Sequence, residues 1–420
     1  MTGIKQELAR FFEEQLKAQQ RVSLLRKKSS LSFDDNSEES KLLQSIEPQN
    51  LQKKIRPIYS KKGINQLKIG DHPDFQHLQG GGSEFCGIIS VFMDMVGSTK
   101  LCRRFDLDDV FIIKNSYIST ATSLVLAFDG HVHRIMGDAV LAFFGGKSIN
   151  NDQGAVDALN FASIMMVYAQ EIVAPYLKEL GFDDNFGIRI GIDYGKKESV
   201  LWKRYGFVGM DEITATSFYV DIASKLQHNA PKNHVMIGDS FKKHLDIPKE
   251  VLKDPTDDYV ISFLDANRNQ LNYRQYLFLW DKYFNNYNPA LHSVQELCDT
   301  RIELSIHNSK ESIDEDQVSS CSKIVDKNKW IKFRIFLPPH ADLYPIEIDI
   351  KIINNGIEAY EESPEDGGSH SSSLTIDSPN KNPKIHWEHT KYRGLHYAII
   401  SYRTKHQKSL NKNEIGIFIK

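Results

Sequence analysis

The first 28 residues carry apolar side chains at helical spacing, among them Ile4, Leu8, Phe11 and Leu16. This spacing predicts one amphipathic helix over residues 1–28, which we interpret as a packing or dimerisation helix. A helix lying on a membrane surface is the alternative, and the mixture of Glu with Lys on the polar face disfavours it.

Residues 29–84 are mostly Ser, Asp, Glu, Asn and Lys, and they end in three consecutive glycines at 80–82. Such a composition is typical of a connecting segment that has no core of its own. We therefore expect a linker over residues 29–84, with one short helix near residues 42–51.

The hydrophobic pattern changes at residue 85. Runs of β-branched and apolar residues predict strands at 86–93, 131–135, 139–144, 187–193, 234–238 and 274–280. Longer stretches with helical periodicity predict helices at 107–128, 151–180 and 217–228. Strands that alternate with helices indicate a layered domain of helices packed on a sheet, which we place at residues 85–283.

Residues 329–420 alternate apolar and polar positions with period two, at 330–337, 345–353, 394–403 and 415–419. This alternation predicts a separate, all-β sandwich domain. The polar and acidic residues 284–328 are predicted to link the two domains. Residues 361–380, rich in Ser, Gly and Pro, are predicted to form a mobile insertion.

The composition excludes several classes of protein. The chain has 420 residues, 40% hydrophobic and 25% charged, with a formal net charge of −3. This balance argues against a nucleic-acid-coating protein, and no apolar run approaches the roughly 20 residues that a membrane-spanning helix needs. Four cysteines without a CxxC pair argue against a zinc ribbon or a disulfide scaffold. The charged N-terminus lacks the apolar segment of a secretory signal, so we expect a cytoplasmic protein.

The segment VFMDMVGSTKL at residues 91–101 is the first candidate for chemistry. It places Asp94 at the end of a predicted strand and continues into a turn made of Gly97, Ser98 and Thr99. Backbone N–H groups, hydroxyls and a helix N-terminus together favour a bound anion, so this is a candidate phosphate-binding turn. Phe92 on the same strand is a candidate to stack on a base and equally a candidate core residue.

Asp138 follows Asp94 by 44 residues and lies in a Gly-Asp turn between two predicted strands. A hairpin packed beside the first strand would bring the two carboxylates together, and like charges at close range require a cation between them. Oxygen ligands favour magnesium or manganese over zinc. The alternative is an ordinary hairpin turn, in which Asp is common.

Asp221 and Lys225 lie four residues apart, on one face of the predicted helix 217–228. Such a pair is either a solvated ion pair or part of a polar face directed at a nucleotide.

Together these segments resemble the catalytic domain of class III adenylate and guanylate cyclases. The matching motifs are FxDxxGST at 92–99, GDAVxAxF at 137–144, RIGIDxG at 189–195 and VDIASKL at 220–226. The resemblance implies an α+β fold with a ferredoxin-like core, in which a ribose 3′-hydroxyl attacks the α-phosphate and pyrophosphate leaves. It also implies that Asp94, Asp138 and the carbonyl of Met95 hold two Mg²⁺ or Mn²⁺ ions per active site.

The same resemblance implies a head-to-tail homodimer. One chain would supply the metal ligands, and its partner would supply Arg134 and the region from Thr214 to Lys225. Lys225 stands where the family has a transition-state arginine, and Asp221 where it has an asparagine. Lys225 can still stabilise developing charge, whereas Asp221 beside phosphates is unfavourable unless it is paired.

Arg134 and Thr214 stand at the two base-contacting positions of the family. The arginine side chain only donates hydrogen bonds, so it suits acceptors on cytosine, uracil or guanine and disfavours adenine.

The C-terminal domain carries a second resemblance. Segments 351–359 (KIINNGIEA) and 388–402 (EHTKYRGLHYAIISY) resemble AGS-C, a sensor domain of some bacterial cyclases and defence nucleotidyltransferases. A class III-like cyclase followed by this domain resembles the pyrimidine cyclases of bacterial Pycsar anti-phage systems. The resemblance implies conversion of CTP or UTP to cyclic CMP or cyclic UMP on phage infection, with an unknown ligand or phage-derived signal at the C-terminal domain.

Other functions remain open at this point. They are an adenylate or guanylate cyclase with an appended sensor, and a pseudocyclase that binds nucleotide without turnover. The cation that holds the triphosphate is not identified, and Arg268 and Lys282 are candidates by position alone. His389 and Tyr392 are candidates for a sandwich corner or a ligand groove. We expect no nucleic-acid partner and no membrane span.

Overall fold

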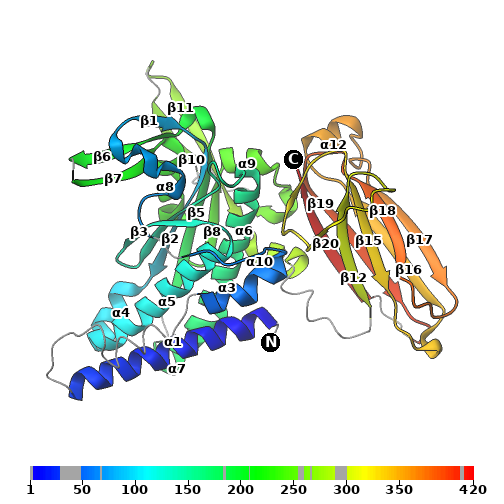
Figure 1. The fold of residues 1–420 in the computed structure, drawn as a ribbon, viewed down its shortest axis with the longest axis horizontal. Helices are drawn as coiled ribbons and strands as arrows, with labels where there is room; N and C mark the ends of the chain where they lie inside the picture. Colours follow the sequence, from blue (N-terminus) through cyan, green and yellow to red (C-terminus); the bar gives the residue numbers. More distant parts are fainter. Residues whose placement is uncertain are drawn as a thin grey trace. The chain divides into compact units, whose positions relative to one another are not determined.

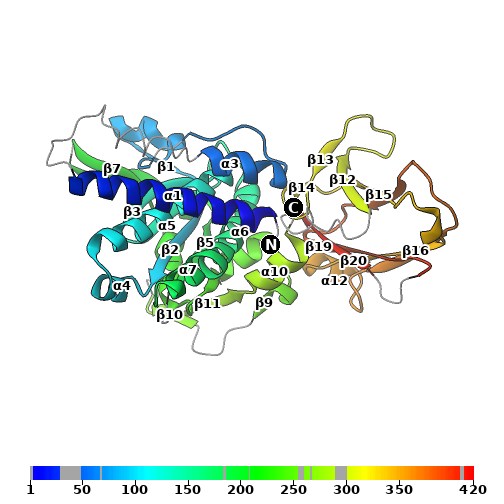
Figure 2. The same cartoon turned by 90° about the horizontal axis from the view of Figure 1, so that it is seen from below.

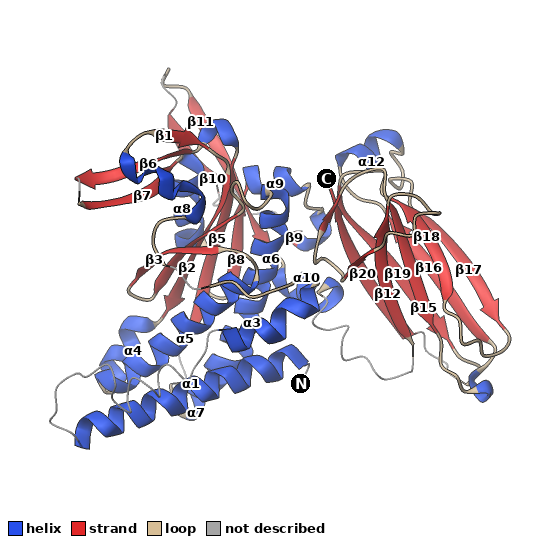
Figure 3. Ribbon diagram, in the orientation of Figure 1, coloured by secondary structure: helices blue, strands red, loops and turns tan. Residues whose placement is uncertain are grey.

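A computed structural model describes residues 3–28, 49–66, 69–182, 186–207, 209–253, 260–264, 267–288, 300–406 and 411–420. The chain divides into two compact units (Figure 1). The N-terminal unit comprises residues 1–57, 62–241 and 254–278, and the C-terminal unit comprises residues 58–61, 242–253 and 279–420. Figure 3 shows that the first unit combines helices with sheets, whereas the second consists mainly of strands.

The N-terminal unit is built on a mixed sheet with the strand order β10-β11-β8-β5-β2-β4-β3. Strand β2 is antiparallel to both of its neighbours, β4 and β5, whereas β5 and β8 are parallel. The strands are β2 (Ile88–Val96), β3 (His131–Met136), β4 (Ala139–Phe144), β5 (Gly187–Gly195), β8 (His234–Gly238), β10 (Val260–Leu264) and β11 (Gln270–Phe278). Six of these strands overlap the predicted ones, whereas β10 is not predicted.

Helices cover both faces of this sheet. On one face α8 (Phe218–Asn229) approaches β5 so closely that a Cβ at Gly191 would lie 2.2 Å from the backbone nitrogen of Gln227. The opposite face carries α5 (Leu107–Ala127) and α6 (Asn151–Tyr168), and Phe144 of β4 contacts Phe161 of α6 there. A π-helical turn (Ala169–Val173) and α7 (Ala174–Glu179) continue α6.

The predicted N-terminal helix is α1 (Gly3–Lys28), and it packs along α5 (Figure 2). The apolar positions Ile4, Leu8 and Phe12 are buried within the chain, and the Phe12 ring meets Tyr168 edge-on at 5.8 Å. Burial of this stripe fits the packing role that its spacing predicts.

The prediction of a linker at 29–84 is wrong for most of its described part. This part contains α3 (Gln49–Ile55), 3₁₀ turns at Arg56–Tyr59 and Pro73–Gly80, and β1 (Ser83–Phe85). The polar composition conceals a few apolar anchors, since Leu51, Ile55 and Phe75 are almost wholly buried. Most of the helix predicted near 42–51 lies outside the described residues.

A small antiparallel sheet flanks the main one and has the order β1-β6-β7. Its other strands are β6 (Leu201–Phe207) and β7 (Met210–Thr216). The indole of Trp202 on β6 is fully buried and stacks on Phe75, with ring centroids 3.9 Å apart. This contact holds residues 73–80 against the small sheet.

The C-terminal unit is a sandwich of two sheets, as the period-two pattern predicts. Their orders are β13-β12-β15-β18 and β14-β20-β19-β16-β17. Apolar residues of both sheets, including Phe333, Ile348, Ile400 and Ile417, form its core. The strands are β12 (Arg301–His307), β13 (Asp316–Val318), β14 (Ile324–Val325), β15 (Trp330–Phe336), β16 (Ile346–Ile353), β17 (His370–Ile376), β18 (Lys384–His389), β19 (Gly394–Arg403) and β20 (Asn411–Ile419).

Two predicted boundaries in this region are wrong. The expected linker 284–328 holds β12, β13 and β14, and the predicted domain limit at 283 falls inside α10 (Trp280–Tyr287) of the C-terminal unit. The expected insertion 361–380 holds the end of α12 (Ile357–Glu362) and all of β17, which pairs with β16. Both segments are polar because their strands lie near the edges of their sheets, where one side faces solvent. The unit also holds β9 (Leu252–Lys253), and α9 (Asp239–Leu245) is shared between the two units.

Among the described helices, α5 alone is long and apolar enough to cross a membrane. Within its most apolar 18-residue window, 72% of the residues are buried inside the chain. Core helices of this kind pass the same test of length and hydropathy.

Candidate active site

Asp94 lies near the end of β2, where a neighbour on β5 holds its carboxylate. The register pairs Asp94 with Arg189, so both side chains project from the same face of the sheet. Arg189 Nη2 lies 3.0 Å from Asp94 Oδ2, while Arg189 Nη1 donates to the carbonyl of His228 at 3.0 Å. Arg189 of the same chain therefore neutralises the charge of Asp94.

Asp138 lies in the turn between β3 and β4. Gly137 adopts a φ of +66° there, a conformation that favours glycine over other residues. Strands β2 and β4 pair as far as Met93 with Val140. Continuing this register places Asp94 beside Ala139, one residue from Asp138, so the turn brings the two carboxylates to the same end of the sheet.

The charges of both carboxylates affect the phenol of Tyr117, on α5. It is wholly buried, and its hydroxyl has no hydrogen-bond partner among the described residues. Burial raises the pKa of Tyr117 well above its usual range, and the negative charges of Asp94 and Asp138 raise it further. The charges of the two carboxylates therefore both act on the buried phenol of Tyr117.

The donor set fits a divalent cation. Asp138 Oδ2 is buried and has no hydrogen-bond partner in the part of the chain that the structure describes. A buried, ionised oxygen without a partner is unfavourable, and a cation beside it would remove that cost. Within the same residues no group of three or more His, Cys, Asp and Glu side chains could hold a metal. An ion here would therefore rest on two carboxylates, the predicted Met95 carbonyl, waters and substrate oxygens, which is the ligation that Mg²⁺ and Mn²⁺ accept.

The predicted phosphate-binding turn directly follows the strand of Asp94. Gly97 has a φ of +92° and precedes α4 (Ser98–Arg104). The N–H groups of Lys100 and Leu101 bond back to the carbonyl of Gly97. Ser98 and Thr99 thus form the first turn of α4, in the strand–turn–helix order that the sequence predicts.

Arg134, on β3, is held by Glu212 of β7, which belongs to none of the sequence motifs. Arg134 Nε lies 2.7 Å from Glu212 Oε2, and Arg134 Nη2 contacts Glu212 Oε1. Both side chains are partly exposed, at 40% and 34%. Pairing at two points fixes the plane of the guanidinium, and its remaining N–H groups are left to face solvent or substrate.

Thr214, on β7, is bonded to the imidazole of His133. Thr214 Oγ1 lies 3.1 Å from His133 Nε2, and His133 Nδ1 lies 3.0 Å from the carbonyl of Gly70. Burial lowers the pKa of His133, which favours the neutral ring. A carbonyl only accepts, so Nδ1 carries the proton and Nε2 accepts from the Thr214 hydroxyl. The oxygen of Thr214 therefore remains as an acceptor for another group.

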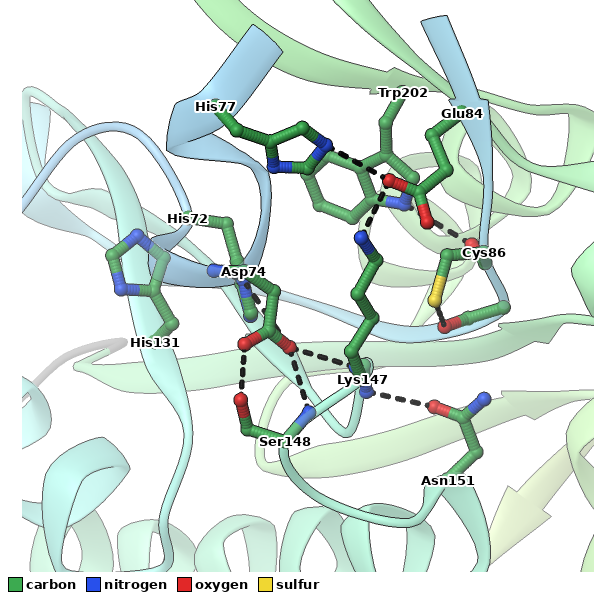
Figure 4. Close-up of polar contacts among 12 residues, drawn as sticks. His72, Asp74, His77, Glu84, Cys86, His131, Lys147, Ser148, Asn151 and Trp202 are labelled. Carbon is green, nitrogen blue, oxygen red and sulfur yellow. Dashed lines mark hydrogen bonds and ion pairs between the residues drawn. The ribbon is translucent and has the colours of Figure 1, made fainter.

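The segment from Ile69 to Phe75 straps these two strands together. Gly70 bonds to Val132 of β3, and Asp71 Oδ1 accepts from the backbone nitrogen of Ile213 on β7 at 2.8 Å. Figure 4 shows how the next residues are anchored: the carboxylate of Asp74 accepts from the backbone nitrogens of Lys147 and Ser148 and from the Ser148 hydroxyl. The strap therefore fixes β7, and with it Thr214 and Glu212, beside β3.

The other candidates make no hydrogen bond or ion pair with these groups among the described residues. Asp221 and Lys225 are both exposed on the outer side of α8, and no ion pair joins them within the described residues. Phe92 is half-buried and packs against a core cluster. Arg268 is exposed in the turn between β10 and β11, and Lys282 is exposed on α10 of the C-terminal unit.

Comparison with known proteins identifies the family. Residues 281–420 match the Adenylyl/Guanylyl and SMODS C-terminal sensor domain. A cytidylate cyclase of Escherichia coli is 38% identical over 378 residues, covering 85% of this chain and 79% of the relative. This chain belongs to the cytidylate cyclase family. A cytidylate cyclase of Staphylococcus aureus is also 38% identical, over 63% of this chain and 62% of its own. The crystal structure of the adenylyl cyclase CyaB from P. aeruginosa covers 47% of this chain and 95% of its own, with 18% identity and a TM-score of 0.39.

Membership in the cytidylate cyclase family confirms several predictions. The chain belongs to a family of pyrimidine nucleotide cyclases, and it combines an α+β unit with a C-terminal AGS-C sensor domain. The family match begins at residue 281, close to residue 279, where the longest segment of the C-terminal unit begins, rather than at the predicted 329.

Three residues of this candidate site carry no prediction from the sequence: Arg189, Glu212 and His133. Arg189 opens the RIGIDxG motif and could have been found by placing that strand beside the strand of Asp94. Glu212 and His133 carry no local signal, because their partners belong to other strands.

Proposed function

We propose that this cytidylate cyclase homologue converts CTP to 3′,5′-cyclic CMP and pyrophosphate with two divalent metal ions per site. The observation that carries the proposal is the pair Asp94 and Asp138, which share one end of the sheet while Asp138 Oδ2 lies buried without a partner. A divalent cation would give Asp138 Oδ2 the partner that it lacks and would also complement the charge of Asp94.

The roles of the residues follow from their surroundings. Asp94, Asp138 and the Met95 carbonyl would hold Mg²⁺ or Mn²⁺, which supplies a lower pKa for the attacking 3′-hydroxyl and charge neutralisation on the departing pyrophosphate. Arg189, now paired with Asp94, would turn its guanidinium to the triphosphate once that carboxylate is engaged. The first turn of α4 would add N–H and hydroxyl donors to the phosphate oxygens.

Two features favour cytosine over uracil. Arg134 offers donors to O2 and N3 of cytosine, and Glu212 holds those donors in one plane. His133 turns the hydroxyl of Thr214 so that its oxygen accepts, which suits the 4-amino group of cytosine and not the 4-carbonyl of uracil. Guanine can also accept hydrogen bonds from an arginine, and the turnover assay distinguishes GTP from CTP as the substrate.

The proposal includes a homodimer with shared sites. Asp221 and Lys225 face outward from α8, so they are available to a partner chain. Lys225 would then stabilise the charge that develops on the α-phosphate bound to the other subunit. This arrangement follows the class III resemblance, in which Arg134, Thr214 and Lys225 act across the dimer.

The biological role that we propose is a second messenger for anti-phage defence in the cytoplasm. Its support is the match of the C-terminal unit to a sensor-domain family, attached to a nucleotide cyclase. We propose that the sensor domain receives the infection signal and that a separate effector protein reads the cyclic nucleotide.

A four-way turnover assay tests the substrate. The purified chain receives ATP, GTP, CTP or UTP with Mn²⁺, and cyclic products are identified by mass, with Asp138→Asn as the control for metal-dependent chemistry. Cyclic CMP as the main product supports the proposal. Cyclic UMP or a cyclic purine overturns the reading of Thr214 and Arg134, and no product from any nucleotide with an intact dimer supports the pseudocyclase.

A further inference from the structure

The C-terminal unit has a partly open cavity of about 220 Å³ between its two sheets. One wall comes from Ile331 and Phe333 of β15, and the other comes from Ile352, Ala398 and Ile417 of the facing sheet. A cavity of about 150 Å³ already admits benzene, so this one admits a fused two-ring heterocycle. Packed sheets lie about 10 Å apart, which gives the space between them a flat shape suited to a planar ring.

The polar groups of the cavity gather around Glu388. Its side chain, on β18, is only 16% exposed. Glu388 Oε1 accepts from His386 Nε2 at 2.5 Å and from His370 Nε2 at 3.2 Å. Burial alone would raise the pKa of Glu388, but these two hydrogen bonds lower it below its usual range, so the carboxylate is ionised.

The second oxygen of Glu388 is the feature that calls for a ligand. Both histidines use Oε1, and Oε2 has no hydrogen-bond partner among the described residues, although Glu388 lines the cavity. An ionised carboxylate oxygen beside apolar walls can accept a hydrogen bond from a ligand. A ligand that presents an N–H from its ring plane would donate to Oε2 and would fill the apolar space with the rest of the ring.

The charges at the cavity argue against a phosphorylated ligand. Lys391 is the one lysine or arginine among the lining residues, and it is ion-paired with Glu362. Its ammonium also lies 4.9 Å from the centre of the Tyr392 ring. The cavity therefore holds no excess positive charge to neutralise a phosphate, and a neutral base or nucleoside fits it better than a nucleotide.

We propose that this cavity binds an uncharged, purine-sized heterocycle through a ring N–H donated to Glu388 Oε2. The site lies wholly within the C-terminal unit and shares no residue with the proposed cyclase site. His389 and Tyr392 both line the cavity. The sequence analysis gave a sandwich corner and a ligand groove as the two alternatives for these residues. His396, also in the lining, accepts from the backbone of Asn355 and donates to the carbonyl of Tyr392, so it supports the wall.

The experiment measures thermal unfolding and binding calorimetry of the full chain with guanosine and with 1-methylguanosine, which lacks only the ring N–H. Guanosine at a saturating concentration is expected to raise the Tm by about 5 °C, and 1-methylguanosine to leave it unchanged. Adenosine, which has no ring N–H on its Watson–Crick edge, should behave like 1-methylguanosine.

Two variants locate the effect. Glu388→Gln keeps one oxygen for the histidines but turns the free acceptor into a donor, so the guanosine shift should vanish. Ala398→Leu fills the cavity and should abolish it independently. Glu347→Gln is the matched control, because this exposed glutamate of β16 lies outside the cavity.

No shift with guanosine, an equal shift with 1-methylguanosine, or a shift that survives in both Glu388→Gln and Ala398→Leu would overturn the proposal. The readout needs no turnover, so it is independent of the proposed substrate. Asp138→Asn protein should bind guanosine as the wild type does, and loss of binding in that variant would also count against a site in the C-terminal unit.

Discussion

The hydroxyl of Thr214 donates to Nε2 of His133, 3.1 Å away, although the two residues belong to different sheets. Because His133 Nδ1 is committed to the carbonyl of Gly70, the direction of this hydrogen bond is fixed. Thr214 therefore presents an acceptor, and a substrate amino group complements it.

Thr214→Val is expected to weaken the preference for CTP over UTP. The valine keeps the volume but removes the acceptor for the 4-amino group, so kcat/KM for CTP should fall roughly 10- to 100-fold while that for UTP changes little. Steady-state kinetics with both nucleotides measure this change. Thr216→Val is the matched control on the same strand, where the hydroxyl bonds to Tyr205 instead. Equal losses for CTP and UTP would show that Thr214 does not read the base.

Glu212→Gln tests whether the carboxylate positions Arg134. Without its negative charge the two-point pairing is lost or weakened, and the guanidinium becomes free to rotate. KM for CTP should rise about tenfold with a smaller effect on kcat, since the base is remote from the reacting phosphorus. Asp211→Asn, which affects the neighbouring pair with Arg204, should leave KM unchanged. A fall in kcat without a rise in KM would contradict a role in base binding.

Asp138→Asn should separate catalysis from stability. The neutral amide removes repulsion from Asp94 and relieves a buried, unpartnered charge, so the Tm should stay the same or rise. Turnover should fall roughly 100-fold or more because the metal loses a ligand. Turnover and thermal unfolding are measured on the same sample, with Asp106→Asn as control, since that side chain makes no capping bond. A large drop in Tm would mean that the carboxylate stabilises the fold, against the metal role.

The sequence predicts the Asp94–Asp138 arrangement because both residues belong to motifs near tight turns of neighbouring strands. The two predicted strands and the Gly-Asp turn are enough to bring both carboxylates to the same end of the sheet. By contrast, Arg134 meets Glu212, and His133 meets Thr214, across two sheets joined by the strap at 69–75. The hydrophobic pattern of the sequence does not predict either of these two contacts.

The missed strands have a similar physical cause. β12 pairs along its whole length with β15, but its own alternation is short and is surrounded by charged residues. β17 is an edge strand of mostly Ser and Thr, which the composition marks as loop. An edge strand needs only one buried face. Its polar residues are therefore compatible with a strand, but this becomes visible only when the neighbouring strand that pairs with it is known.

Mixing two inactive variants tests the shared site. Asp94→Ala removes a metal ligand, and Lys225→Ala removes the proposed transition-state cation. In a mixed homodimer one of the two sites carries both lesions and the other carries neither, so a 1:1 mixture that exchanges subunits should recover about a quarter of wild-type turnover. The check is a turnover assay on the mixture, with the exchange verified by mass. No recovery in verified mixed dimers would place Asp94 and Lys225 in the same chain's site.

Stability should depend on pH through Asp193, which is wholly buried on β5. Its carboxylate accepts from the Tyr273 hydroxyl at 2.7 Å and from the backbone nitrogen of Phe241, near the start of α9. Burial raises the pKa of Asp193 to about 7, although these hydrogen bonds lower it. The pKa of Asp193 is higher in the folded chain than in the unfolded chain. The protonated acid therefore adds its full contribution to the free energy of unfolding below about pH 4, and this contribution is lost as the pH rises towards 7.

Asp193→Asn removes this titration while keeping the shape of the side chain. The wild type should therefore lose stability between pH 4 and pH 7 relative to the variant, by at most about 4 kcal/mol for a shift of this size. Denaturant unfolding of both proteins at several pH values, compared pairwise, measures the difference. Asp106→Asn, at an exposed aspartate that does not contribute to the raised pKa of Asp193, is the control and should track the wild type across the range. Parallel curves for wild type and Asp193→Asn would show that Asp193 is ionised in the folded chain throughout.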